Sequence, residues 1–308
     1  NNSSTAAGGY SLERINPQNP CEGITNWQGS TSFLGGTPGK ENAVLNLSTA
    51  SSILNIIDAY PITATQVIIS FDKAINEADL TAINNFSITN NVITNLSLIE
   101  NNFSVVLLEL QNSLIENQME TINVATTFSD CIGNPIDGQS SYPIALPVFA
   151  AANDIIINEI LFNPQTGGVD FIELYNRSEK VIDLNGLFLA NQALDNPQFK
   201  PITTQKLLFP KSFVVLTESP TDIKSRYTVE NPNALFSQDL PTFPDKDGNA
   251  LLYVNDGGET IFIDEFDYTT DYHNALLNDK NGVSLERISA DLPTQDGGNW
   301  NSAGVDVG

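Results

Sequence analysis

A motif that occurs twice constrains the fold of this 308-residue chain more than any other feature. Residues 9–15 read GYSLERI and residues 282–288 read GVSLERI. Asn-Trp follows each motif in the same register, so the motifs and the only two tryptophans, Trp27 and Trp300, are both separated by 273 residues. Such self-similarity predicts a repeated unit. We expect residues 1–45 to be the C-terminal strands of an upstream copy of a domain whose next copy ends the chain.

The composition narrows the class of protein. There are 13 Lys and Arg against 37 Asp and Glu, a formal net charge of −24, which argues against binding nucleic acid or an anionic membrane surface. No apolar run approaches the roughly 20 residues that span a bilayer, so membrane insertion is not expected. The chain has 36 Asn, 20 Gly and 16 Pro. These residues favour turns, so we expect short strands joined by many turns.

Apolar residues recur with the period of β-strands between the two motifs. In residues 66–71, Val67, Ile69 and Phe71 alternate with polar or smaller side chains, as in a strand with one buried face. Many such short runs and no long amphipathic run predict an all-β fold of tandem Ig-like β-sandwiches. The predicted division is 1–45, the end of an upstream domain; 46–147, an Ig-like domain; and 148–308, a domain of the repeated type.

Three stretches of the last segment resemble a known family. Residues 158–164 (NEILFNP), 168–176 (GVDFIELYN) and 182–187 (IDLNGL) occur in the order found in the bacterial lamin-tail domain, and GVSLERI at 282–288 continues the likeness. Residues 1–45 resemble the end of a second such domain. The middle segment, with ISFDK at 69–73 and DCIGNPI at 130–136, is more loosely similar to the bacterial Ig-like domains of surface proteins.

The resemblance implies a location and a function. These families occur in secreted, multi-domain bacterial proteins, so it implies a protein secreted to the bacterial cell surface. Its implied partners are other domains of the same polypeptide, with surface proteins, secretion-machinery proteins or glycans as further candidates. We expect a non-catalytic structural spacer or adhesion array. One alternative is an accessory module of a secreted hydrolase, a nuclease or phosphatase whose catalytic domain lies outside this chain. The other is a carbohydrate- or calcium-binding module.

No residue is assigned a catalytic role, so an enzyme is not expected. His273 is the sole histidine, and nothing near it resembles a nucleophile elbow, so we interpret it as a hydrogen-bonded loop residue. Glu159 and Glu173 are expected on neighbouring strands, where two close carboxylates could act as acid and base. We favour the simpler interpretation, in which each points to solvent or caps a turn.

Two further sets of residues have open interpretations. Asp245, Asp247 and Asn249 alternate before and after Gly248, so they are candidate calcium ligands, although Asp-Gly before a strand is also an ordinary turn. No other cofactor is expected. Cys21 and Cys131 are the only cysteines, and in a secreted protein they either pair with each other, stay free or pair elsewhere.

The repeated motif itself is expected to be a fold element. Leu12 and Ile288, with Ile15 and Leu285, have the spacing of core positions, and the Arg of each motif could bridge a carboxylate.

Overall fold

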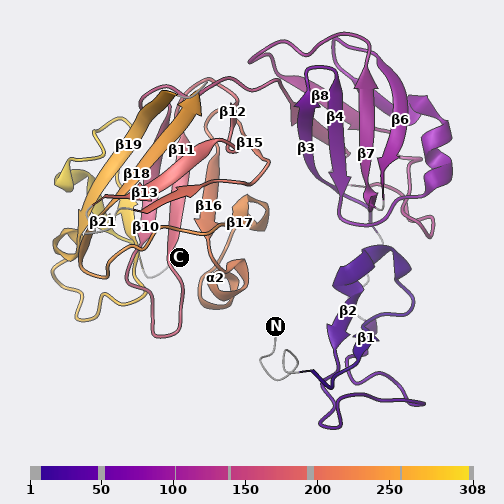
Figure 1. Ribbon diagram of the computed structural model, residues 1–308, viewed down its shortest axis with the longest axis horizontal. Coiled ribbons are helices and arrows are strands. Elements are labelled where there is room, and N and C mark those ends of the chain that lie inside the picture. The colour runs from indigo at the N-terminus through magenta and orange to yellow at the C-terminus, as the bar shows by residue number, and fades with distance from the viewer. Residues whose placement is uncertain are drawn as a thin grey trace. The chain divides into compact units, whose positions relative to one another are not determined.

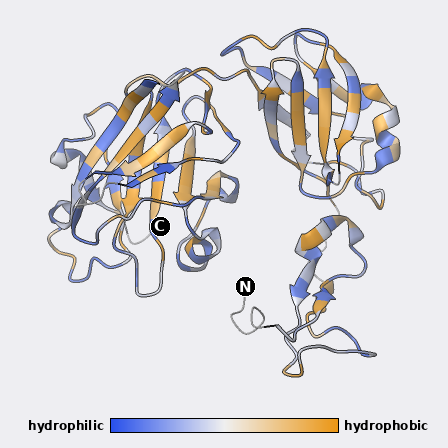
Figure 2. Ribbon diagram, in the orientation of Figure 1, coloured by the Kyte–Doolittle hydropathy of each residue, from blue (hydrophilic) through white to orange (hydrophobic). Residues whose placement is uncertain are grey.

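The computed structural model describes residues 8–47, 53–100, 102–137, 140–192, 198–256 and 259–304, and its chain forms two compact units, 1–146 and 147–308. Both units are built of β-strands in several sheets, which confirms the predicted all-β class (Figure 1). Apolar residues gather on the strands of both units (Figure 2). No helix among the described residues is long and apolar enough to cross a bilayer.

The first unit contains a hairpin and a sandwich. The hairpin pairs β1 with β2, and the sandwich has a four-stranded sheet, β3-β4-β7-β6, and a three-stranded sheet, β5-β8-β9. Its elements are β1 (Leu12–Arg14), η1 (Pro20–Asn26), β2 (Trp27–Gly29), β3 (Ile56–Thr63), β4 (Gln66–Phe71), η3 (Glu77–Thr81), η4 (Ile83–Asn85), β5 (Phe86–Ile88), β6 (Ile93–Ile99), β7 (Asn102–Leu110), β8 (Glu120–Val124) and β9 (Ser141–Ile144).

The sandwich core follows from the alternation in β4. Val67, Ile69 and Phe71 are buried while the residues between them are partly exposed, as the pattern predicts. Aromatic rings join the two sheets: the Phe86 ring lies 6.5 Å from that of Phe71 and 4.9 Å from that of Phe128. Such edge-to-face contacts between large rings add to the hydrophobic burial that holds the sheets together.

The second unit is a larger sandwich. A six-stranded sheet, β17-β16-β11-β10-β20-β21, faces a four-stranded sheet, β14-β13-β18-β19, and the short strands β12 and β15 pair beside them. Its elements are β10 (Ile155–Leu161), β11 (Phe171–Asn176), β12 (Ile182–Asp183), β13 (Leu187–Asn191), β14 (Gln198–Pro201), β15 (Leu207–Leu208), β16 (Phe213–Thr217), α2 (Pro220–Arg226), η5 (Pro232–Ala234), β17 (Leu235–Ser237), β18 (Asp247–Asp256), β19 (Glu259–Thr269), η6 (Thr270–Tyr272), β20 (Leu285–Arg287), η7 (Gly297–Asn299) and β21 (Trp300–Ser302).

The two faces of the six-stranded sheet have different environments. Its inner face contributes Ile157, Ile160 and Leu285 to the main core between the sheets. On its outer face a smaller apolar cluster joins Leu161 to Ile223 of α2. The helix begins where the Ser219 side chain accepts a hydrogen bond from the backbone N–H of Asp222, a standard N-cap. The sheet is therefore buried on its inner face and partly covered on its outer face.

Candidate functional site

A bulge in β10 lies at a buried polar site of the second unit. The pairing of β10 with β11 shifts register between Ile157 and Glu159. The N–H of Ile157 donates to the Asp264 carboxylate at 2.8 Å, and its carbonyl accepts from Nε and Nη2 of Arg287 at 2.8 and 2.6 Å. Because a bulge disrupts the ladder locally, buried backbone groups there need other partners, and these two charged side chains supply them.

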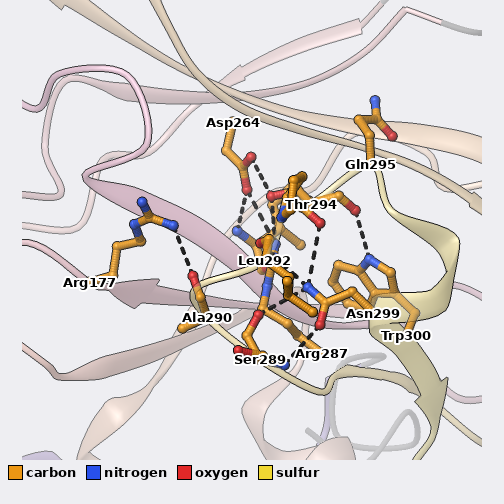
Figure 3. Close-up of polar contacts among 12 residues, drawn as sticks. Arg177, Asp264, Arg287, Ser289, Ala290, Leu292, Thr294, Gln295, Asn299 and Trp300 are labelled. Carbon is orange, nitrogen blue, oxygen red and sulfur yellow. Dashed lines mark hydrogen bonds and ion pairs between the residues drawn. The ribbon is translucent and has the colours of Figure 1, made fainter.

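Thr294 joins the two charged groups (Figure 3). Its hydroxyl donates to Asp264 Oδ1 and accepts from Arg287 Nη2, each at 2.6 Å. Arg287 Nη2 lies 3.7 Å from Asp264 Oδ2, with both side chains almost fully buried. Burial raises the pKa of Asp264, while its hydrogen bonds to Thr294 and Ile157 and the charge of Arg287 lower it. Burial lowers the pKa of Arg287 to about 10, so the guanidinium stays charged at neutral pH.

Trp300 closes the site from the end of the chain. Its ring stacks on Phe266 with centroids 3.7 Å apart, and the Arg287 guanidinium lies 4.9 Å from its centroid. Its Nε1–H donates to the carbonyl of Thr294 at 2.7 Å (Figure 3). These contacts fasten the β20–β21 hairpin to β10 and β19, so the second motif is a fold element that closes the sandwich. Arg287 forms an ion pair with Asp264, one of the contacts open to the Arg of the motif, whereas no sequence signal pointed to Thr294.

The β1–β2 hairpin repeats main-chain and asparagine hydrogen bonds of this hairpin. The N–H of Ile15 donates to the carbonyl of Asn26 at 2.8 Å, and that of Ile288 donates to the carbonyl of Asn299, also at 2.8 Å. The side chain of each Asn also binds the loop between the two strands. Asn26 Nδ2 donates to the carbonyls of Asn16 and Asn19. Asn299 Nδ2 donates to the carbonyls of Ser289 and Leu292, which are the equivalent positions 273 residues later. The repeated sequence therefore folds to a repeated local structure.

The two hairpins differ in what covers them. Leu285 is fully buried, whereas Leu12 is 71% exposed. Trp300 is 4% exposed and Trp27 is 42% exposed. The prediction of a core position is therefore wrong for Leu12, and also for Ile288, which is 63% exposed. For Leu12 the reason is tertiary: β20 has β10 beside it, while β1 pairs with β2 alone among the described strands. Ile288 instead lies one residue beyond the end of β20.

The predicted pair of glutamates lies in a row of three. Glu159 on β10 is the register partner of both Glu173 on β11 and Glu286 on β20. The Ser284 hydroxyl donates to Glu159 at 2.5 Å, and Asn158 Nδ2 donates to Glu173 at 2.8 Å. The expected neighbouring strands are confirmed, but the glutamates are partly buried rather than pointing freely to solvent.

The pKa values of all three glutamates in this row are raised. Burial, together with the negative charges of Glu173 and Glu286, raises the pKa of Glu159 to about 8, although its bond from Ser284 acts in the opposite direction. Burial also raises the pKa of Glu173 and Glu286. Glu159 therefore carries its proton at neutral pH. Three adjacent carboxyl groups in a half-buried environment can share protons. Sharing lowers the number of negative charges and so reduces the repulsion between them.

His273 ends η6 and is buried. Its Nδ1 lies 2.9 Å from the Ser302 hydroxyl, and its ring packs 5.9 Å from that of Phe162. Burial and the charge of Lys280 lower its pKa to about 4, so the imidazole is neutral at physiological pH. The contacts of this histidine join the η6 loop to β21.

Two of the three candidate calcium ligands bind other protein groups. Asp247 accepts a hydrogen bond from the Thr269 hydroxyl at 2.8 Å. The side-chain oxygen of Asn249 accepts a hydrogen bond from the N–H of Gln192, the residue after β13, at 2.9 Å. Within the described ranges no group of three or more His, Cys, Asp or Glu side chains is arranged to hold a metal ion. Calcium binding by Asp245, Asp247 and Asn249 stays a prediction.

The two cysteines form a disulfide across the first unit. Cys21 lies in η1, in the segment that connects β1 to β2, and Cys131 lies in a turn of the sandwich, with their Cα atoms 5.6 Å apart. Backbone hydrogen bonds flank the bond: the N–H of Ala74 donates to the carbonyl of Cys21 at 2.7 Å, and the N–H of Cys131 donates to the carbonyl of Ala74 at 2.9 Å. The bond connects residues that are 110 positions apart.

Comparisons with known proteins find a family match within the second unit. The family model of the lamin tail domain matches residues 149–270. No curated protein matches the sequence. Similar solved structures include the N-terminal part of the bacterial S-layer protein SbsC, at 15% identity and a TM-score of 0.28, covering 53% of this chain and 40% of that one. The S-layer protein rSbsC(31-844) is similar at 14% identity and a TM-score of 0.28, covering 77% of this chain and 42% of that one.

The chain spans about two fifths of the length of these solved chains. The family match covers most of the strands that enclose the main core, and the six-stranded sheet continues beyond it to β21. It confirms the family expected from the motifs at 158–176. Residues 149–270 of this chain therefore match the model of the lamin tail domain family.

Proposed function

We propose that this chain is part of a non-catalytic, modular protein of the bacterial cell surface, in which β-sandwich units follow one another as structural spacers or adhesive units. The observation that carries the proposal is the covalent connection within the first unit. The disulfide between Cys21 and Cys131 joins a repeated hairpin to the neighbouring sandwich. Disulfides persist in oxidising, extracellular environments, which supports export from the cell.

The position of the disulfide suits a chain under tension. All strands of the first sandwich except β9 lie between the two cysteines in the sequence. A force applied along the polypeptide would pass from Cys21 directly to Cys131 through the covalent bond. The intervening residues would then carry no load through their own backbone, and the length of this module would be preserved.

Single-molecule extension tests the proposal. The chain is held by its two ends and stretched fully with and without a reducing agent. Reduction frees 110 residues, which at 3.3–3.6 Å each adds about 360–400 Å to the stretched length. A double variant, Cys21→Ser with Cys131→Ser, should have the longer length in both conditions. Equal lengths for the unreduced and reduced native chain would remove the observation on which the proposal rests.

The two alternatives have separate tests. Hydrolase-accessory modules would be supported by a nuclease or phosphatase domain in the same reading frame. A carbohydrate- or calcium-binding module would be supported by retention on a glycan array, or by a melting temperature that rises with added calcium. Glu159→Gln is an informative variant for catalysis. Loss of a hydrolytic activity in this variant would contradict the non-catalytic assignment, because the raised pKa of Glu159, about 8, lies within the range in which a carboxyl group can transfer protons near neutral pH.

A further inference from the structure

The described residues of the first unit leave the inner face of the β1–β2 hairpin largely uncovered, with Leu12 71% and Trp27 42% exposed. We propose that this face, formed by Leu12, Arg14 and Trp27, covers the open edge of a second lamin-tail-type sandwich, formed by residues that precede the hairpin in the same polypeptide. The proposal concerns a partner surface, and it holds whether the assembly serves as a spacer, an adhesin or an accessory to an enzyme.

The complete copy in the second unit shows what such a hairpin needs. Leu285 pairs with Ile160 on β10 and is fully buried in the main core. Arg287 donates to the carbonyl at the β10 bulge, and Trp300 stacks on Phe266 of β19. The partner of a hairpin of this type therefore offers three things: a strand edge, a buried backbone carbonyl beside a carboxylate, and an aromatic ring.

The first hairpin already holds its side chains in the corresponding arrangement. The Arg14 guanidinium lies 5.0 Å from the Trp27 centroid, against 4.9 Å for Arg287 and Trp300. The register is also the same, since Arg14 is opposite Trp27 in the β1–β2 pair as Arg287 is opposite Trp300 in the β20–β21 pair. A charged and an aromatic group preorganised in this way lose little conformational entropy when a partner covers them.

The segment after the hairpin covers the outer face of β1. On the outer face, Glu13 is buried, and the Thr37 hydroxyl donates to it at 2.7 Å. Asn42 Nδ2 donates to the carbonyl of Arg14 at 2.9 Å, so the segment after the hairpin also reaches β1. Leu12 and Trp27 nevertheless remain 71% and 42% exposed. Large apolar groups exposed together on one side of an otherwise covered element mark an interaction surface.

One position departs from the complete copy. Cys21 stands 273 residues before Thr294, whose hydroxyl bridges Arg287 and Asp264 inside the second unit. In the first unit this position instead forms the disulfide to Cys131. The upstream sandwich would thus lack the hydroxyl bridge, and the hairpin would be covalently fixed to the domain that follows it. Successive units would then be joined through one hairpin that contacts both.

The first experiment measures the accessibility of Trp27. A Trp300→Phe background leaves Trp27 as the only tryptophan of residues 1–308, and acrylamide quenching is compared between this chain and the natural polypeptide extended upstream by about 120 residues, with any upstream tryptophan also changed to Phe. We expect the exposed fraction to fall from 42% toward the 4% of Trp300, roughly tenfold. Unchanged quenching in the extended polypeptide would overturn the proposal. If quenching of Trp27 in residues 1–308 falls only as the protein concentration rises, and a dimer forms, the partner is a second copy of the chain. That result would also overturn the proposal.

The second experiment asks whether the hairpins are interchangeable. Residues 284–303 of the full chain are replaced by the sequence of residues 11–30 carrying Cys21→Thr. We expect the second unit to stay protease-resistant, with the transplanted tryptophan buried. A matched transplant that also carries Leu12→Ser should lose this resistance. If both transplants are digested alike, while the native chain is not, the first hairpin does not fit a sandwich of this type.

Discussion

The glutamate row should make the second unit less stable as the pH rises. The pKa of Glu159 is about 8 in the folded chain against 4.5 as the ordinary value. The folded state therefore binds a proton that the unfolded state releases between these two values, and the free energy of unfolding falls as pH increases through that window. A shift of this size corresponds to a loss of at most about 5 kcal/mol, since each pKa unit is worth about 1.4 kcal/mol.

Glu159→Gln removes this dependence. The neutral amide keeps an oxygen that can accept the bond from Ser284 and cannot ionise next to Glu173 and Glu286. We expect the variant to match the native chain near pH 4.5 and to be more stable than it at pH 8 by up to about 5 kcal/mol. Urea unfolding in a Trp27→Phe background reports on the second unit through Trp300, whose ring is buried in its core.

A matched control is available at a different acidic residue. Burial and the charges of Asp245 and Glu218 raise the pKa of Asp170 to about 7. Asp170→Asn should therefore remove its own part of the pH dependence and leave that of Glu159. If Glu159→Gln has the same slope of unfolding free energy against pH as the native chain between pH 5 and 8, the carboxylate row is not the cause and the reasoning is refuted.

Three other predictions follow from the polar contacts. Arg287→Met should cost the second unit about 3–5 kcal/mol, measured by urea unfolding, because it leaves a buried carboxylate without its cation. Arg14→Met, at the equivalent and only partly buried position, should cost far less, and equal losses would contradict this account. NMR titration should place the pKa of His273 near 4, well below the ordinary value of 6.5. Burial of this ring therefore destabilises the fold only as the pH falls below about 6.5, and His273→Ala should reduce this sensitivity to acid. A measured pKa near 6.5 would show instead that the ring is hydrated. Mass mapping without reduction should recover a peptide linked through Cys21 and Cys131, whereas two thiols that alkylate in the native chain would refute the bridge.

Several features of this protein were predictable from local sequence. Alternation in residues 66–71 predicts a strand with one buried face, because side chains of a strand point to opposite sides in turn. The repeat of 273 residues predicts two hairpins with the same internal hydrogen bonds, since those bonds join residues within a stretch of about 20. The order of motifs between 158 and 187 predicts the lamin tail family.

Other features depend on contacts between residues that lie far apart in the chain. Leu12 and Leu285 occur in identical pentapeptides, yet one is exposed and the other fully buried, because only Leu285 has β10 beside it. Likewise, sequence patterns placed Glu159 and Glu173 on neighbouring strands, but the approach of Glu286 and the burial that raises the pKa of Glu159 arise only when β20 joins the sheet. Local sequence determines the conformation of each hairpin, and the tertiary structure decides what covers it, because burial depends on surfaces brought together from distant parts of the chain.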